Sequence, residues 1–198
     1  MTWLRASNVN FDFVGPWQGT FEPALPTPPQ PPLLQGESEP PTPDHVKGGY
    51  ALDADPAFDK DHFCHSGRQA AQVKNTIAAQ IATYQPDYVL IELGFNDLGW
   101  FVNGPDGLLS DMKTLIDNAR GAKSNIKFAI ANVPDRTRIG GRQDLIDNTK
   151  IYNANLASAI PAWSSSNSPI KLVLFNENYD CMSRISRRLR MAQTNMVF

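Results

Sequence analysis

The chain has 198 residues, of which 41% are apolar, and its 18 lysine and arginine residues nearly balance 20 aspartate and glutamate residues, for a formal net charge of −2. This length and apolar content are sufficient for one domain with a buried core. The small net charge gives no reason to expect nucleic acid or an anionic membrane as the main partner. No apolar run is long enough to span a membrane, so we expect a soluble chain. We also expect it to be a monomer.

The N-terminal part combines a short extended run with a proline-rich stretch. Residues 10–15, NFDFVG, have the pattern of a β-strand. Prolines dominate from Glu22 to Pro43, and because proline lacks a backbone N–H donor, this stretch cannot join a helix or the interior of a sheet. We predict a surface insertion at about residues 22–45 in the polyproline II conformation. A ligand for a proline-recognising partner or a lid over a site is the alternative.

Helical and extended patterns alternate through the middle of the chain. Apolar residues at helical spacing, such as Val73, Ile77 and Ile81, are followed by short, almost continuous apolar runs. Such runs are typical of parallel strands that are covered on both faces. The alternation predicts an α/β fold with a parallel sheet between helical layers. The predicted helices are 73–84, 108–119 and 145–160, and the predicted strands are 87–94, 126–133 and 171–175.

The last segment breaks this rhythm. Residues 181–198 contain four arginines close together and have neither an amphipathic face nor a strand pattern. We therefore expect a single domain over residues 1–180 and an atypical arginine-rich tail over 181–198. The two cysteines, Cys64 and Cys181, can pair or stay reduced, and they do not fix the redox compartment.

Polar residues follow the first predicted strand of the sheet. Ligands of open parallel sheets bind outside the carboxyl ends of the strands, which is where Gly94, Asn96 and Asp97 stand. Gly94 permits a sharp turn, supported by Asp97, and the Asn96 amide can then donate to a ligand oxygen. The alternative is that Asn96 and Asp97 only form an Asx-type turn.

The stretch DHFCHSGRQ, residues 61–69, precedes the first predicted helix. Ser66 and Gln69 have the spacing of a capping box, which would place Gly67 in the first helical turn with its N–H unpaired. A glycine N–H at a helix start can approach a reacting oxygen closely. With the Asn96 amide it would form an oxyanion hole, a pair of fixed donors for the charge that develops on a carbonyl oxygen.

Other interpretations of this stretch stay open. Asp61, His62, Cys64 and His65 could bind a metal, although their crowding does not match a zinc spacing. His62 or His65 could act as a general base, Cys64 as a nucleophile, and His65 with Ser66 as a nucleophilic pair. The oxyanion interpretation is favoured, and we expect neither a metal nor a cofactor.

Several segments together resemble the SGNH hydrolases, the GDSL-type esterases and lipases. They are FDFVG at 11–15, HSGRQA at 65–70, YVLIELGFNDLGW at 88–100, ANVPDRTR at 131–138 and IYNANLASAI at 151–160. The resemblance implies a three-layer α/β/α, flavodoxin-like fold and the cleavage of small carboxylic esters, often acetyl groups on carbohydrates. It also implies that Gly67 and Asn96 are the oxyanion-hole donors and that Gly94 supports the turn that presents Asn96.

Two blocks of the resembled family have no counterpart in these residues. The family's nucleophile lies in a Gly-Asp-Ser segment after the first strand, and its base lies in a C-terminal Asp-x-x-His segment. Here all three histidines, His45, His62 and His65, precede residue 66. We therefore expect a hydrolase that lacks its first strand, its nucleophile and its base, through truncation or an error in the gene model. The alternative is a non-catalytic module that binds an acyl or carbohydrate ligand.

The location of the protein is not fixed by this sequence. The first residues, MTWLRASNVN, lack the apolar core of a signal peptide. Because many members of the resembled family are secreted, the complete form is expected to be secreted as well.

Overall fold

A computed structural model describes residues 6–19, 57–65, 67–136 and 140–175. The chain divides into two compact units, Met1–Arg68 and Gln69–Phe198. The proline-rich insertion, Ser66, Cys181 and the arginine-rich tail lie outside the described residues. None of the helices in the described ranges combines the length and apolar character that a membrane span requires.

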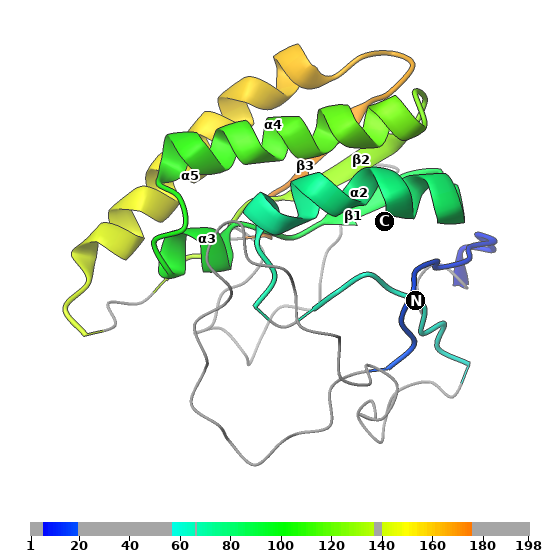
Figure 1. Cartoon of the computed structure of the whole chain (residues 1–198), viewed down its shortest axis with the longest axis horizontal. Helices are drawn as coiled ribbons and strands as arrows, with labels where there is room; N and C mark the ends of the chain where they lie inside the picture. The colour runs from blue at the N-terminus through cyan, green and yellow to red at the C-terminus, as the bar shows by residue number, and fades with distance from the viewer. Residues whose placement is uncertain (1–5, 20–56, 66, 137–139, 176–198) are drawn as a thin grey trace. The chain divides into compact units, whose positions relative to one another are not determined.

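The second unit is a parallel α/β unit (Figure 1). Its three strands are all parallel and lie in the order β1-β2-β3. This confirms the α/β fold class predicted from the alternating pattern. The elements in chain order are α2 (Ala70–Tyr84), β1 (Tyr88–Ile91), α3 (Phe95–Gly99), α4 (Pro105–Ala122), β2 (Lys127–Ala131), α5 (Gln143–Trp163) and β3 (Ile170–Val173).

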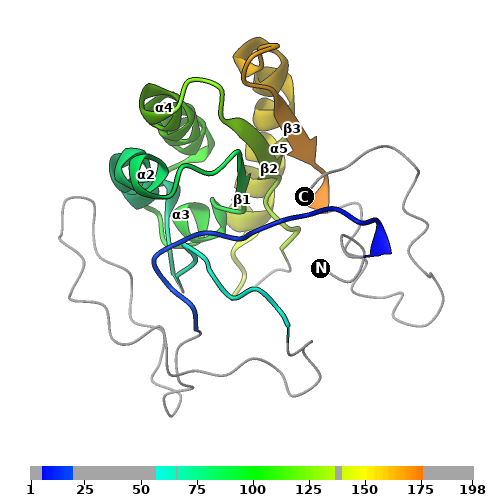
Figure 2. The ribbon, with the colours of Figure 1, turned by 90° about the vertical axis from the view of Figure 1, so that its right-hand side faces the viewer.

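The main helices of this unit form one layer (Figure 2). Helix α4 contacts both α2 and α5, so it lies between them. This follows from the topology, since α4 and α5 each connect a strand to its neighbour in the same direction, and right-handed crossovers place both helices on one face. The core lies between this layer and the sheet, where Leu115, Ile116 and Ile130 have no exposed surface.

The opposite face of the sheet is partly open. Tyr88 and Leu90 alternate along β1 with the inward residues and are 40% and 46% exposed. Lys127, in register with Tyr88 on β2, lies over the tyrosine ring and donates to its hydroxyl. The expectation that this strand is covered on both faces is therefore wrong, because the described helices cover only one face. The second helical layer of the expected three is not formed by the described residues.

The predicted strand at residues 10–15 is not a strand. In the described part of the first unit, residues 11–15 form neither a helix nor a strand, and the Phe13 N–H donates to the Asp59 carboxylate at 2.6 Å. A single antiparallel bridge instead joins Trp17 to His62, with N···O distances of 3.2 and 2.9 Å. A side-chain acceptor has replaced the neighbouring strand that the sequence pattern suggested.

Asn153 of α5 closes the end of strand β2. Its amide accepts from the Val133 N–H at 2.9 Å and donates to the Val133 carbonyl at 2.8 Å. Val133 is 1% exposed, so these two backbone groups have been removed from water. The Asn153 side chain thus satisfies both backbone groups of Val133, which lies beyond the hydrogen-bonded part of β2. The same two bonds fix α5 against the carboxyl edge of the sheet.

We expect Asn153→Ala to lower the free energy of unfolding by about 2–4 kcal/mol, because it leaves two buried backbone groups without partners. Urea unfolding followed by circular dichroism measures this change. Asn155→Ala is the matched control: Asn155 is on the same helix and bonds Asp106 at the surface, so its removal should change stability by less than about 0.5 kcal/mol. Equal effects of the two substitutions would contradict this role of Asn153.

Candidate active site

The turn after β1 depends on a glycine. Gly94 has a φ of +107°, a region that other residues rarely adopt. A Cβ atom built at Gly94 would lie 2.8 Å from Leu108 Cδ2 and 3.0 Å from Val133 Cγ2. Gly94 is therefore required both for its backbone conformation and for the close approach of α4, and it directs the chain into the short helix α3.

Asn96 is the second residue of α3 and stands at the carboxyl end of β1. Its backbone carbonyl accepts from the Trp100 N–H at 2.9 Å, and the residue is half-buried. This is the edge where the sequence analysis placed a ligand-facing amide. The edge of the sheet at which a site was expected is thus formed by β1, the Gly94 turn and α3.

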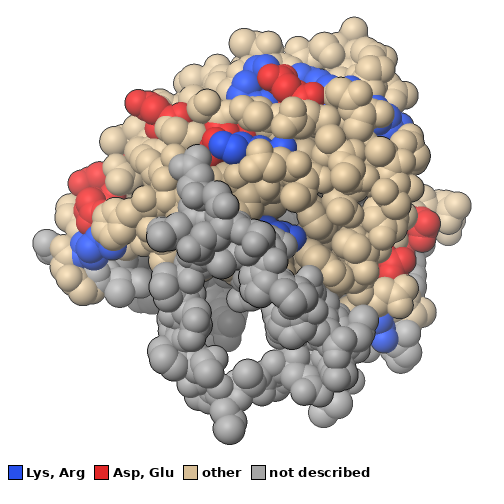
Figure 3. Space-filling model, in the orientation of Figure 1, with Lys and Arg blue, Asp and Glu red and all other residues tan. Residues whose placement is uncertain are grey.

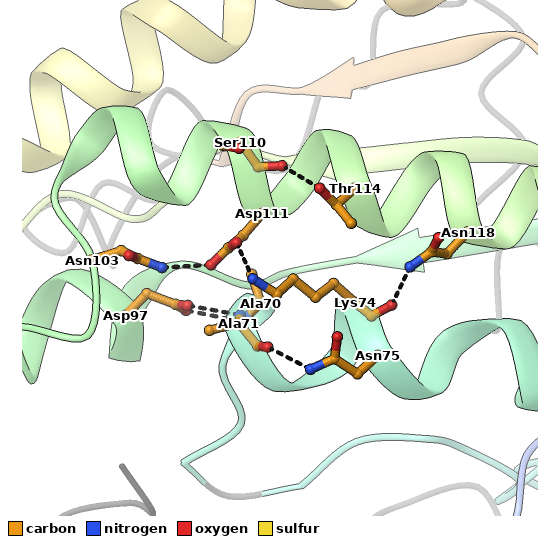
Figure 4. A network of polar contacts seen from close by, with 10 residues as sticks. All are labelled: Ala70, Ala71, Lys74, Asn75, Asp97, Asn103, Ser110, Asp111, Thr114 and Asn118. Atoms are coloured by element: carbon orange, nitrogen blue, oxygen red, sulfur yellow. Dashed lines mark hydrogen bonds and ion pairs between the residues drawn. The ribbon is translucent and has the colours of Figure 1, made fainter. Parts of the chain in front are cut away.

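Asp97 holds the beginning of helix α2 (Figure 4). Its two carboxylate oxygens accept from the Ala70 N–H at 3.1 Å and the Ala71 N–H at 3.2 Å. These are the first two residues of α2, whose N–H groups have no partner within the helix. The Asx-turn interpretation is therefore wrong for Asp97, whose side chain caps a helix 27 residues earlier in the chain.

Burial dominates the electrostatics of Asp97. The side chain has no exposed surface. Loss of solvation raises the pKa of its carboxyl above the ordinary value, and the backbone N–H groups of Ala70 and Ala71 oppose this rise without cancelling it. The charge of Asp111 adds to the rise.

A second polar group joins α2 to α4 beside this cap (Figure 4). Lys74 of α2 forms an ion pair with Asp111 of α4, and Asn103 donates to the other oxygen of Asp111 at 2.5 Å. Asp111 is only 7% exposed, and Lys74 and Asn103 compensate the charge of its buried carboxylate. The start of α2 is thus held by two carboxylates, one from α3 and one from α4.

Helix α2 begins later than the capping-box pattern predicts. Its N-cap is Gln69, whose N–H donates to the Gln72 side chain at 3.2 Å, and the first helical residue is Ala70. Gly67 therefore lies before the helix and not in its first turn, which is a correction of the sequence-based prediction. The physical reason is its φ of +79°, which is incompatible with a right-handed helix.

Within the first unit, Gly67 belongs to a tight turn. The Arg68 N–H donates to the His65 carbonyl at 3.2 Å, and a positive φ at the third residue is typical of a type II turn. Gly67 lies in the first unit and Asn96 in the second. Their joint action as oxyanion donors stays a prediction.

His62 has a structural role in the first unit. Its Nε2 lies 2.7 Å from the Gly19 carbonyl, and its Nδ1 accepts from the Cys64 N–H at 3.1 Å. Both ring nitrogens of His62 thus have partners within the first unit, which disfavours it as a general base. His65 packs edge-on against Trp17. Within the described ranges, no group of His, Cys, Asp and Glu residues is placed to hold a metal ion.

Comparison with solved structures reveals the same fold in three esterases. An acetyl esterase mutant with an acetate ion superposes with a TM-score of 0.57 at 20% identity, covering 86% of this chain and 68% of that one. A family 3 carbohydrate esterase from Talaromyces cellulolyticus has a TM-score of 0.58 at 21% identity, with coverages of 86% and 68%. The Clostridium thermocellum family 3 carbohydrate esterase has a TM-score of 0.56 at 21% identity, with coverages of 89% and 65%.

The fold is that of the SGNH-type esterases. This confirms the resemblance drawn from the GFND turn and its neighbouring segments. No protein-family model matches the chain, and no curated protein matches it by sequence. The likeness therefore rests on the structure and on the motifs at the carboxyl edge of the sheet.

We expect Gly94→Ala to lower the free energy of unfolding by about 2–4 kcal/mol, because the methyl group combines left-handed backbone strain with overpacking against α4. Gly121→Ala provides the control, since a Cβ at this exposed helical position meets nothing within 4 Å, and it should stabilise by roughly 0.5–1 kcal/mol. Chemical unfolding of both variants measures the difference. A neutral Gly94→Ala would contradict the close approach of α4.

Asp97→Asn tests the buried cap. The asparagine keeps one acceptor for two N–H groups, so we expect a loss of about 1–3 kcal/mol at neutral pH. Because the folded-state pKa of Asp97 is raised, the protonated carboxyl contributes stability that is fully present below the ordinary aspartate pKa and is lost as pH rises through the folded value. The stability advantage of the wild type over Asp97→Asn should therefore shrink between about pH 4 and pH 7. Urea unfolding across this range measures it, and a constant difference would be evidence against a raised pKa.

Proposed function

We propose that this chain carries the oxyanion side of an SGNH-type carboxylic ester hydrolase that acts on small acetyl esters, including acetylated carbohydrates. The observation that supports it most is the position of Asn96, which follows the Gly94 turn at the carboxyl end of β1. The neighbours in structure are an acetyl esterase and carbohydrate esterases. This likeness in fold supports an ester-directed site at the same edge of the sheet in this chain.

The proposed chemistry is stabilisation of negative charge. When a nucleophile attacks an ester carbonyl, the carbonyl oxygen becomes an oxyanion, and the Asn96 amide and the Gly67 N–H donate to it. Asp97 fixes the first turn of α2, which begins three residues after Gly67 along the chain. Donors that are held before the reaction need no reorganisation when the charge develops.

The nucleophile and the base of the resembled family have no counterpart in these 198 residues. The oxyanion hole and substrate binding alone retain about 10³–10⁴-fold acceleration over water in serine hydrolases. We therefore propose that this chain by itself binds the acyl group and hydrolyses it only at such a residual rate. The proposal includes no metal or cofactor.

A second candidate is a non-catalytic module that binds an acyl or carbohydrate ligand at the same edge. The observation that favours it is the state of the histidines: none follows residue 65, and both ring nitrogens of His62 already have partners. This candidate shares the binding prediction but requires that no hydrolysis depend on Asn96.

Acetate binding by the ¹⁵N-labelled chain, followed by NMR chemical shifts, tests the proposed site. We expect Asn96→Ala to weaken acetate binding by about tenfold or more, because it removes one hydrogen bond to a charged oxygen. The control is Asn155→Ala, which removes an amide from the surface of α5 and should bind like the wild type. Unchanged affinity in Asn96→Ala would contradict the proposal.

Hydrolysis of p-nitrophenyl acetate separates the two candidates. A slow reaction that falls in Asn96→Ala supports the hydrolase. No reaction above the rate in buffer, together with Asn96-dependent acetate binding, supports the binding module.

A further inference from the structure

Two arginines lie on two exposed phenylalanines beside Asn96. We call this group the arginine ledge; it consists of Phe95, Phe101, Arg136 and Arg142. Phe95 immediately precedes Asn96, and Phe101 follows helix α3. The guanidinium carbon of Arg136 lies 3.5 Å from the centroid of the Phe95 ring, and that of Arg142 lies 3.9 Å from the Phe101 ring. All four residues belong to the second unit.

Arg136 is held against α3 without an acidic partner among the described residues. Its Nη2 donates to the Phe95 carbonyl, and its Nε is buried with no hydrogen-bond partner. The absence of a side chain at Gly99 leaves room for it, since a Cβ there would lie 3.1 Å from Nη1. Burial and the nearby charge of Arg142 both lower the pKa of Arg136. The charge of this guanidinium is therefore poorly compensated.

The acidic residues nearest along the chain do not compensate it. Asp135 is exposed and makes no ion pair among the described residues. Asp144 accepts from Nε and Nη2 of Arg142 at 2.8 and 2.6 Å, so it already has a basic partner. Figure 3 shows that basic and acidic side chains are otherwise mixed over the face of the molecule that it presents. An incompletely paired cation beside the candidate donor is thus a local feature of this edge.

The aromatic members of the ledge are unusually open. Phe101 is 72% exposed and Phe95 is 46% exposed. The ring surface that the arginines leave exposed costs free energy in water, and the apolar C–H face of a sugar ring can cover it. A role for Arg136 only in holding α3 in place would account for its bond to Phe95 but not for the exposure of Phe101.

We infer that the arginine ledge binds the carboxylate of an acidic sugar, so that the ester substrates of this site are acetylated uronic acids rather than neutral sugars. Arg136 supplies a planar donor fork for the carboxylate, a geometry that suits arginine better than lysine. The phenylalanine rings support the sugar ring beside Asn96. The inference rests on the proposed function, because it names the substrate class of the same site.

Chemical-shift titration of the ¹⁵N-labelled full chain tests this with three probes. D-galacturonate has the ring and the carboxylate, D-galactose has only the ring, and glycolate has only the carboxylate. We expect galacturonate to bind about tenfold more tightly than either of the other two. Arg136→Gln should reduce its affinity to that of galactose, and Phe101→Ala should reduce it toward that of glycolate.

Matched variants keep the test specific. Lys150→Gln removes one positive charge from an exposed position of α5 and should leave the preference for galacturonate unchanged. Arg136→Lys keeps the charge without the fork and should give an intermediate affinity. The amide spectrum of each variant reports whether it is folded, and Phe101 is exposed enough that its removal should not unfold the chain.

The outcomes separate this inference from the proposed function. Equal binding of galacturonate and galactose, no binding of galacturonate, or a preference that survives in Arg136→Gln would overturn the inference. None of these results affects the Asn96-dependent binding of acetate, which tests the ester site. The opposite result is also possible: the galacturonate preference depends on Arg136, but acetate binds equally well to Asn96→Ala. This result would support the arginine ledge and contradict the oxyanion role of Asn96.

Discussion

The contact on which the candidate site depends is the buried pair of hydrogen bonds from Ala70 and Ala71 to the Asp97 carboxylate. It connects the turn after β1 to the beginning of α2, two segments that the chain brings together only in the folded state. The charge meets the positive end of a helix dipole there, yet burial still raises the pKa of Asp97. Ionisation of this carboxyl lowers stability relative to its protonated form, and its two hydrogen bonds specify one position for the start of α2.

The topology explains why the residues of the candidate site gather at one edge of the sheet. All three strands are parallel, so their carboxyl ends share one edge, where the Gly94 turn, α3 and the Asn153 bridge also lie. Side chains of helix α3 make contacts on two sides. Asp97 binds the start of α2, while the Phe95 ring contacts Arg136 at the protein surface. Rigid packing on one side and open aromatic and cationic groups on the other are what a ligand site at the rim of a sheet requires.

Sequence periodicity predicted the helices α2, α4 and α5 and the strands β1, β2 and β3, because each is encoded locally. The apolar spacing of Val73, Ile77 and Ile81 predicted the helix that became α2, and the glycine of the GFND segment predicted the turn. The start of α2 could not be predicted, because the local Ser66–Gln69 spacing indicates a helix that begins at Gly67, whereas the observed start at Ala70 is capped by the distant Asp97. The open face of β1 and the arginine ledge were missed for a related reason, since both depend on which element covers which residue.

The most direct test of the central claim is a crystal structure of this chain with acetate. We expect one acetate oxygen to lie within hydrogen-bond distance, about 2.7–3.1 Å, of both the Asn96 amide nitrogen and the Gly67 backbone nitrogen. An acetate bound elsewhere, or an Asn96 amide and a Gly67 N–H too far apart to share one oxygen, would contradict it.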